Sequence, residues 1–110
     1  MTTVAILFSI LGTWHGTLHQ SGAKPFAVTA TIRAGGGRNT VHYSGLDCRG
    51  TWRFLSHRGA TYRYRETITA GRSASCKGTG TVTLKVLGGV RLAYTFRGGG
   101  IVARGTLSRR

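Results

Sequence analysis

The sequence predicts an all-β fold, an up-and-down antiparallel barrel of about eight strands, with a β-sandwich as the alternative. Polar Thr, Arg and His residues alternate with apolar residues along most of the chain, which is the two-residue period of half-buried strands. Gly-rich breaks interrupt this alternation at intervals of about ten residues, as in all-β meanders. No stretch shows a helical period, so we expect short turns to join strand after strand.

The alternation assigns one inward face to each expected strand. The strands are expected at 14–20, 25–34, about 41–43, 51–57, 60–69, 79–87, 90–97 and from 101 onward. The residues predicted to point inward are Trp14, Gly16, Leu18; Phe26, Val28, Ala30, Ile32; Val41, Tyr43; Trp52, Phe54; Tyr62, Tyr64, Glu66, Ile68; Val82, Leu84, Val86; Val90, Leu92, Tyr94, Phe96; Ile101, Ala103, Gly105 and Leu107. Gly88 and Gly89 suit a primed hairpin turn, because both tolerate a positive φ.

Most cationic side chains fall on the face opposite the aromatic rings. The outward set is Arg33, Arg53, Arg63, Arg65, Lys85, Arg91 and Arg97. This parity describes a packed interior and a basic exterior, and closure into a barrel removes the exposed strand edges. An eight-stranded barrel is just filled by its own side chains or holds one small ligand, and the many inward aromatics favour a mostly filled interior.

A chain of 110 residues has room for one domain, which we place at residues 12–110. Residues 1–11 include the apolar run Val4–Leu11, which is far shorter than the ~20 residues that span a bilayer. We interpret this region as the remnant of an export or membrane segment, with an extra strand as the alternative.

Cys48 and Cys76 can form a disulfide, contribute to a metal site or remain buried thiols. No Cys-x-x-Cys spacing exists and no His lies near either cysteine in sequence, which argues against zinc. A disulfide is favoured provided that the compartment is oxidising. In the meander both cysteines lie at the same end, since one strand runs between the two that they precede.

Asp47 and Glu66 are the only acidic residues, so paired-carboxylate catalysis and a carboxylate-rich metal site are not expected. We expect Asp47 to cap a turn. His15 and His19 would lie about 13 Å apart on a strand, too far to share an ion, and His42 and His57 fall at outward or turn positions. We therefore predict no catalytic site, no metal site and no cofactor.

Glu66 shares its predicted face with aromatic rings, where a carboxylate requires hydrogen-bonding or charged partners. It is either a polar anchor in a ligand cavity or one member of a structural pair at a wet rim. The candidate ligand-binding residues are Trp14, Tyr43, Trp52, Tyr62, Tyr64, Glu66 and Tyr94.

The formal net charge of +14 attracts nucleic acid, anionic lipid headgroups or acidic cell-wall polymers. Because the basic residues are scattered along the chain, a merely solvated basic exterior is the simpler interpretation. Base stacking is not expected, since the aromatic residues point inward. Nucleic acid binding would be non-specific, and membrane contact would come only through a segment upstream of residue 1.

Two resemblances add to this interpretation. Gly12-Thr13-Trp14 at the start of the first strand resembles the Gly-x-Trp start of lipocalins and avidin-like barrels, in which an Arg of the last strand packs on the Trp. Arg109 is the best match for that Arg, with Arg104 as the alternative.

A longer resemblance covers residues 12 to about 109. The segments GTWHGTLHQ, LDCRGTW, TYRYRETITAG, GTVTL, LAYTF and ARGTLSRR, with the loop to Cys76, resemble a domain of secreted and surface proteins of actinobacteria. That domain is sometimes attached to receptor-type serine/threonine kinases. The resemblance implies an extracytoplasmic β-barrel with a Cys48–Cys76 disulfide, and it implies no activity.

The function expected from these observations is a non-enzymatic extracytoplasmic binding or sensor module for a small molecule. The alternative is a basic-surface domain that binds nucleic acid or anionic cell-envelope polymers.

Overall fold

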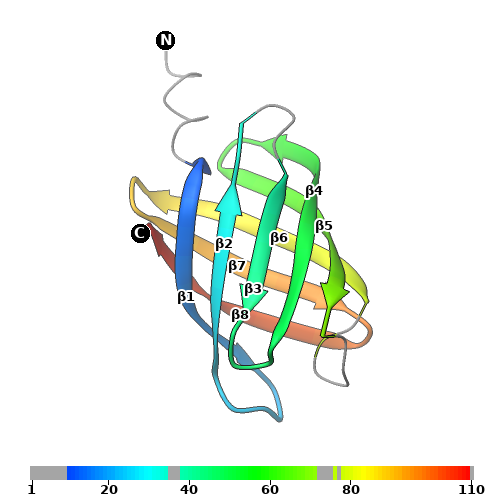
Figure 1. The fold of residues 1–110 in the computed structure, drawn as a ribbon. Helices are drawn as coiled ribbons and strands as arrows, with labels where there is room; N and C mark the ends of the chain where they lie inside the picture. The colour runs from blue at the N-terminus through cyan, green and yellow to red at the C-terminus, as the bar shows by residue number, and fades with distance from the viewer. Residues whose placement is uncertain (1–9, 35–37, 72–75, 77, 110) are drawn as a thin grey trace.

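Eight antiparallel strands close into a barrel in which each strand pairs with its sequence neighbours and β1 pairs with β8 (Figure 1). The computed structural model describes residues 10–34, 38–71, 76 and 78–109. The strands are β1 (Gly12–Gln20), β2 (Phe26–Ile32), β3 (Asn39–Tyr43), β4 (Cys48–Arg58), β5 (Thr61–Ala70), β6 (Thr79–Gly88), β7 (Arg91–Gly98) and β8 (Ile101–Arg109). The predicted up-and-down barrel is confirmed, and the sandwich alternative is wrong.

The up-and-down order distributes the connections between two ends of the barrel. The N-terminal end is where β1 begins and where the β4–β5 and β6–β7 hairpins turn (Figure 1). The disulfide end carries the β1–β2, β3–β4 and β7–β8 turns together with the Cys48–Cys76 bond. The disulfide and its predicted placement at one end are therefore confirmed.

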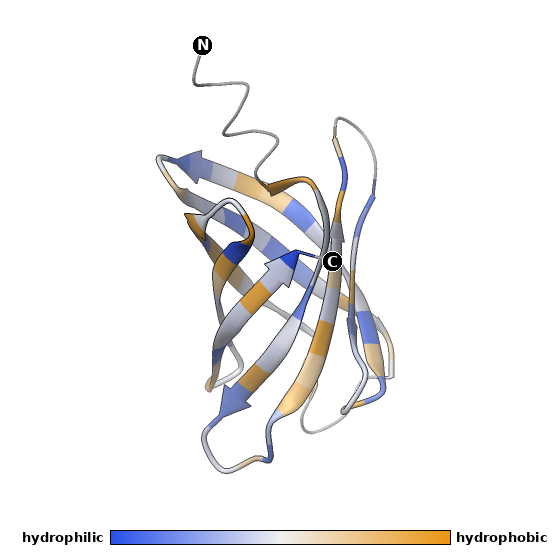
Figure 2. Cartoon of the chain, turned by 90° about the vertical axis from the view of Figure 1, so that its left-hand side faces the viewer, coloured by the Kyte–Doolittle hydropathy of each residue, from blue (hydrophilic) through white to orange (hydrophobic). Residues whose placement is uncertain are grey.

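Alternation along the strands sorts the side chains as the sequence predicts. Hydrophobic and hydrophilic residues alternate along each ribbon, and the hydrophobic set forms one core (Figure 2). On β5, Tyr62, Tyr64, Glu66 and Ile68 are buried, whereas Arg63 and Arg65 between them are exposed. The same separation holds on β2, whose Phe26, Val28, Ala30 and Ile32 are all buried.

The inward prediction fails at two bulges. The β4–β5 register shifts between Phe54 and Ser56, and the β6–β7 register shifts between Val86 and Gly88. Phe54 faces Tyr64 in the ladder, yet it is 53% exposed because it lies beyond the packed core. Val90 lies in the β6–β7 turn and is 61% exposed, so its predicted inward position is wrong.

The β6–β7 turn also differs from the expected one. Gly88 ends β6 and pairs with Arg91, so the turn residues are Gly89 and Val90. Neither Gly88 nor Gly89 has a positive φ, and the primed turn at these glycines is wrong. Likewise, Asp47 shapes its turn through a left-handed backbone (φ 54°), while its exposed side chain makes no hydrogen bond with the described residues.

The seam between the first and last strands is held by Trp14 and Arg109, which face each other in register. The Arg109 guanidinium lies 4.3 Å from the centre of the Trp14 ring and donates a hydrogen bond to the carbonyl oxygen of Leu11. The Trp14 indole N–H donates to the carbonyl oxygen of Ile10 at 2.9 Å. Arg109, rather than the exposed Arg104, therefore packs on the Trp, and the pair fixes the chain as it enters β1.

Two inward glycines allow the same seam to coil tightly. A Cβ atom on Gly16 would lie 2.2 Å from the carbonyl oxygen of Thr106, and one on Gly105 would lie 2.3 Å from that of Thr17. Neighbouring backbone occupies the space that a side chain would need, as at the glycine kinks that close small barrels.

Several expectations fall on residues outside the described part of the chain. The export remnant expected at residues 1–11 is described only at Ile10 and Leu11, which pack against the core. The glycine break at 35–37 and most of the loop before Cys76 also lie outside it. Within the described residues, no helix is long and apolar enough to cross a membrane.

Candidate functional site

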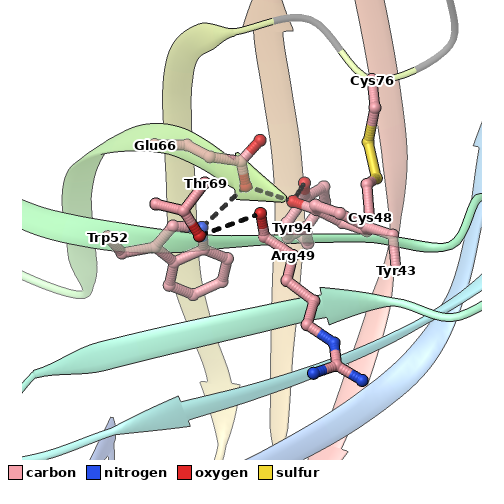
Figure 3. The surroundings of a disulfide bond; sticks show 8 residues. All are labelled: Tyr43, Cys48, Arg49, Trp52, Glu66, Thr69, Cys76 and Tyr94. Atoms are coloured by element: carbon pink, nitrogen blue, oxygen red, sulfur yellow. Dashed lines mark hydrogen bonds between the residues drawn. A yellow bond between two sulfur atoms is a disulfide. The ribbon is translucent and has the colours of Figure 1, made fainter. Parts of the chain in front are cut away.

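A hydrogen-bonded polar cluster crosses the barrel interior near the disulfide end (Figure 3). Glu66 of β5 lies directly opposite Trp52 of β4 in register, and the Trp52 indole N–H donates to its Oε1 at 2.8 Å. The Tyr43 hydroxyl of β3 donates to the same oxygen. The hydroxyl of Tyr94, from β7, lies 2.6 Å from that of Tyr43. The cluster therefore links β3, β4 and β5 to β7, which pairs with none of them in the sheet.

The chemistry of these groups fixes the direction of the hydrogen bonds. An indole N–H can only donate, and a phenol has one hydrogen to give. Because Tyr43 gives its hydrogen to Glu66, the short contact between the two hydroxyls requires Tyr94 to donate to Tyr43. Glu66 is thus the final acceptor of a hydrogen-bond chain that runs from Tyr94 through Tyr43, and it also accepts the hydrogen bond from the Trp52 indole.

Burial governs the electrostatics of this cluster. Desolvation raises the pKa of Glu66 above its ordinary value, against the opposing effect of the hydrogen bonds from Tyr43 and Trp52. The pKa of Tyr43 is raised well above its ordinary value, first by burial and then by the charges of Tyr94 and Glu66. Burial and then Glu66 raise the pKa of Tyr94 in the same way, so both phenols keep their hydrogens at neutral pH.

Little space remains beside the cluster. A cavity of about 20 Å³ is lined by ten residues, which are Gln20, Phe26, Tyr43, Leu46, Glu66, Cys76, Tyr94, Phe96, Ile101 and Ala103. Such a volume accommodates about one water molecule. Cys48 pairs with Tyr43 in register, so the disulfide lies beside the cluster (Figure 3). This end of the barrel is closed by its own side chains.

A larger cavity lies at the N-terminal end. Its volume is about 330 Å³, within the usual range for small-molecule sites. The lining is mostly apolar and consists of Ile10, Leu11, Ile32, Arg33, Ala34, Asn39, Phe54, Tyr62 and Tyr64. The Phe54 ring packs edge-on against Tyr64, with 5.9 Å between centroids, and the rest of the ring is open to solvent.

Tyr64 provides a polar group in this apolar cavity. Its hydroxyl makes no hydrogen bond with any residue that the structure describes. Burial, with a smaller contribution from Tyr62, raises the pKa of Tyr64 to about 12, so it stays a neutral O–H donor. Asn39, by contrast, uses both ends of its amide on the Arg33 N–H and the Trp52 carbonyl.

The candidate ligand residues predicted from the sequence separate into three groups. Tyr43, Trp52, Glu66 and Tyr94 form the polar cluster, and Tyr62 and Tyr64 line the N-terminal cavity. Trp14 lies apart, under Arg109. The structure adds Ile10, Leu11, Ile32 and Phe54 to the cavity, and the break in alternation at Phe54-Leu55 was the signal for the last of these.

The outward basic residues lie where the alternation places them. All seven are exposed, and Arg53 faces Arg65 directly across the β4–β5 ladder. His15, His19 and His57 are exposed and His42 is half-buried. Within the described ranges no group of three or more His, Cys, Asp or Glu side chains could hold a metal ion.

Comparisons with known proteins extend the fold assignment only. No family model and no curated protein matches the sequence. Among solved structures, the chain is similar to a de novo designed fluorescence-activating β-barrel, with a TM-score of 0.65. The match covers 94% of this chain and 95% of the designed one at 16% identity, which shows a shared barrel fold.

Proposed function

We propose that the protein is a non-enzymatic extracytoplasmic module that binds a small, largely apolar molecule in the cavity at its N-terminal end. The observation that carries this proposal is a cavity of about 330 Å³ lined by Ile10, Leu11, Ile32 and the rings of Phe54 and Tyr64. A ligand there would cover the exposed part of Phe54 and gain the hydrophobic free energy of that burial. The 20 Å³ cavity at Glu66 is too small for this role.

The lining also defines the chemistry of the ligand. The Tyr64 hydroxyl is a neutral donor in an apolar wall, so it favours a molecule with one hydrogen-bond acceptor among apolar groups. The neighbouring Arg33 side chain is exposed at the end of β2, where it favours an acceptor with partial negative charge. Both preferences describe an uncharged or weakly acidic lipophilic compound.

The Cys48–Cys76 disulfide supports the extracytoplasmic part of the proposal, because such bonds persist in oxidising compartments. The resemblance to a surface domain of actinobacteria supports the same compartment. Alkylation of free thiols in intact producing cells checks this assignment: we expect both cysteines to be protected until a reductant is added. Thiols that react without reduction would contradict it.

The cavity is tested with N-phenyl-1-naphthylamine, a neutral apolar fluorophore that brightens when it leaves water. Ala34 lines the cavity and is exposed, so Ala34→Trp fills the space without disturbing the core. Ala27→Trp is the matched control, because Ala27 is exposed on β2 away from the cavity. We expect saturable binding that weakens about tenfold or more in Ala34→Trp and is unchanged in Ala27→Trp.

A further variant locates the site within the barrel. Tyr94→Phe alters the polar cluster and leaves the N-terminal cavity as it is, so probe affinity should not change. Absence of saturable binding, or equal affinity in the two tryptophan variants, would overturn the proposal. Weakening by Tyr94→Phe alone would move the site to the barrel interior and overturn it as well.

A further inference from the structure

The exposed large apolar side chains are confined to one end of the barrel. Among the described residues they are Phe54, Leu55, Leu87 and Val90, all in the β4–β5 and β6–β7 hairpins. A hydrogen bond from the Val86 N–H to the Ala60 carbonyl at 2.8 Å joins these hairpins, which project side by side in both views (Figures 1 and 2). Single exposed apolar residues are ordinary, but four on two adjacent hairpins form a patch.

Two of the four side chains are placed by the same structural device. Leu55 and Leu87 are the extra residues of the β4 and β6 bulges, since each lies between the two paired positions where the register shifts. A bulge removes its extra residue from the ladder and re-aims the side chain. Both leucines are consequently exposed, at 40% and 49%.

Cations surround this patch and no acid accompanies them. The exposed basic residues nearest the turns of the two hairpins, and beside the neighbouring ends of β2 and β3, are Arg33, Arg38, Arg58, Arg63, Lys85 and Arg91. Asp47 lies in the β3–β4 turn at the disulfide end, and Glu66 is buried. These are the only two acidic residues of the chain, so the positive charge at this end is not neutralised.

The disulfide end has no exposed large apolar side chain among the described residues. Its described turns are Ser21–Pro25, Ser44–Asp47 and the glycines 98–100, in which Lys24 is the exposed cation and Leu46 is half-buried. Among the described residues, cations are exposed toward both ends of the barrel, but exposed large apolar side chains accompany them only at the N-terminal end.

We propose that the N-terminal end of the barrel docks on an anionic lipid surface. Apolar side chains that enter the headgroup region, flanked by Lys and Arg, are the chemistry that holds proteins at such an interface. A dissolved polyanion would use the cations but not the four apolar side chains, so the observations favour lipid. This docking does not require the cavity to be occupied, and it stands apart from the proposed ligand.

Co-sedimentation with vesicles tests the docking. The full chain is mixed with phosphatidylcholine vesicles and with vesicles in which one third of the lipid is phosphatidylglycerol. We expect binding to the anionic vesicles and much weaker binding to the neutral ones. In Leu55→Ser/Leu87→Ser/Val90→Ser, the affinity for anionic vesicles should fall about tenfold or more. All three side chains are exposed, so circular dichroism should show an unchanged fold.

Matched charge variants separate docking from general electrostatic attraction. Arg58→Gln/Arg91→Gln removes two cations at the N-terminal end, and Lys24→Gln/Arg97→Gln removes two exposed cations toward the disulfide end. We expect the first pair to weaken binding by about fivefold per cation and the second pair to have less than about half that effect.

Three outcomes would overturn the proposal. The first is a serine variant that binds like wild type. Binding would then come from a part of the chain that this variant leaves intact, such as the residues before Ile10. The second is equal weakening by the two charge pairs, which would mean that net charge alone attracts the protein, as for a dissolved polyanion such as oligo-dT. The third is equal binding to neutral and anionic vesicles.

Discussion

The buried carboxyl of Glu66 makes the stability of the barrel depend on pH in an unusual direction. Its pKa is raised in the folded protein above the ordinary 4.5, chiefly by desolvation. The folded state therefore holds this proton more tightly than the unfolded state does. The contribution of Glu66 to the unfolding free energy is highest below pH 4.5 and falls as the pH rises through the folded pKa, by about 1.4 kcal/mol for each unit of the shift.

Glu66→Gln isolates this effect. The amide oxygen can still accept from Tyr43 and from the Trp52 indole, but the residue has no charge to bury. Urea unfolding of both proteins at pH 4 and pH 7 gives the comparison. We expect acidification to stabilise wild type relative to Glu66→Gln, because the four histidines and Asp47 contribute equally to both proteins.

Glu66→Ala measures the hydrogen bonds of the same residue. It leaves the Trp52 N–H without an acceptor, which costs about 1–3 kcal/mol, and the lost side-chain atoms add about 1 kcal/mol or more. We expect a loss of about 3 kcal/mol at pH 4, where the charge no longer contributes. An identical pH dependence in wild type and Glu66→Gln, or relative destabilisation of wild type by acid, would refute this reasoning.

Two further predictions concern the ends of the barrel. Reduction of Cys48–Cys76, whose partners are 28 residues apart, should lower the unfolding free energy in urea by about 3 to 4 kcal/mol, and an unchanged midpoint would contradict this. Arg109→Lys keeps the charge but loses the planar stacking on Trp14, so we expect a loss of about 1–2 kcal/mol in the same assay. Equal stability of wild type and Arg109→Lys would show that the stacked geometry contributes nothing.

Two-residue periodicity predicted most of the fold because burial in a small barrel is decided locally. On β5, a single alternating run places Tyr62 and Glu66 inward and Arg63 outward, as its sequence indicates. The inward prediction failed at Phe54 and Val90, which lie close to the extra residues Leu55 and Leu87, since a bulge depends on the neighbouring strand and has no periodic signal of its own.

The candidate site could be predicted only in part. Alternation places Glu66 inside, but its partner Tyr43 is 23 residues away and Tyr94 lies 51 residues beyond Tyr43. Which of these rings meet is set by the stagger of all eight strands around the barrel, a property that no single strand encodes. For the same reason the sequence predicted one pocket from residues that the structure divides among the polar cluster, the N-terminal cavity and the contact of Trp14 with Arg109.

Trp52 connects the polar cluster with the N-terminal cavity. Its indole N–H is held by Glu66, and its ring lies 5.6 Å from that of Tyr64 in the wall of the N-terminal cavity. Asn39, which also lines the cavity, donates to the Trp52 carbonyl at 3.1 Å. The orientation of the Trp52 ring, which Glu66 holds through the indole N–H, thus sets the surface against which the Tyr64 ring packs. Burial of the Glu66 carboxyl lowers the stability of the barrel at neutral pH. The same carboxyl orients the Trp52 ring, which supports Tyr64 in the wall against which a ligand would pack.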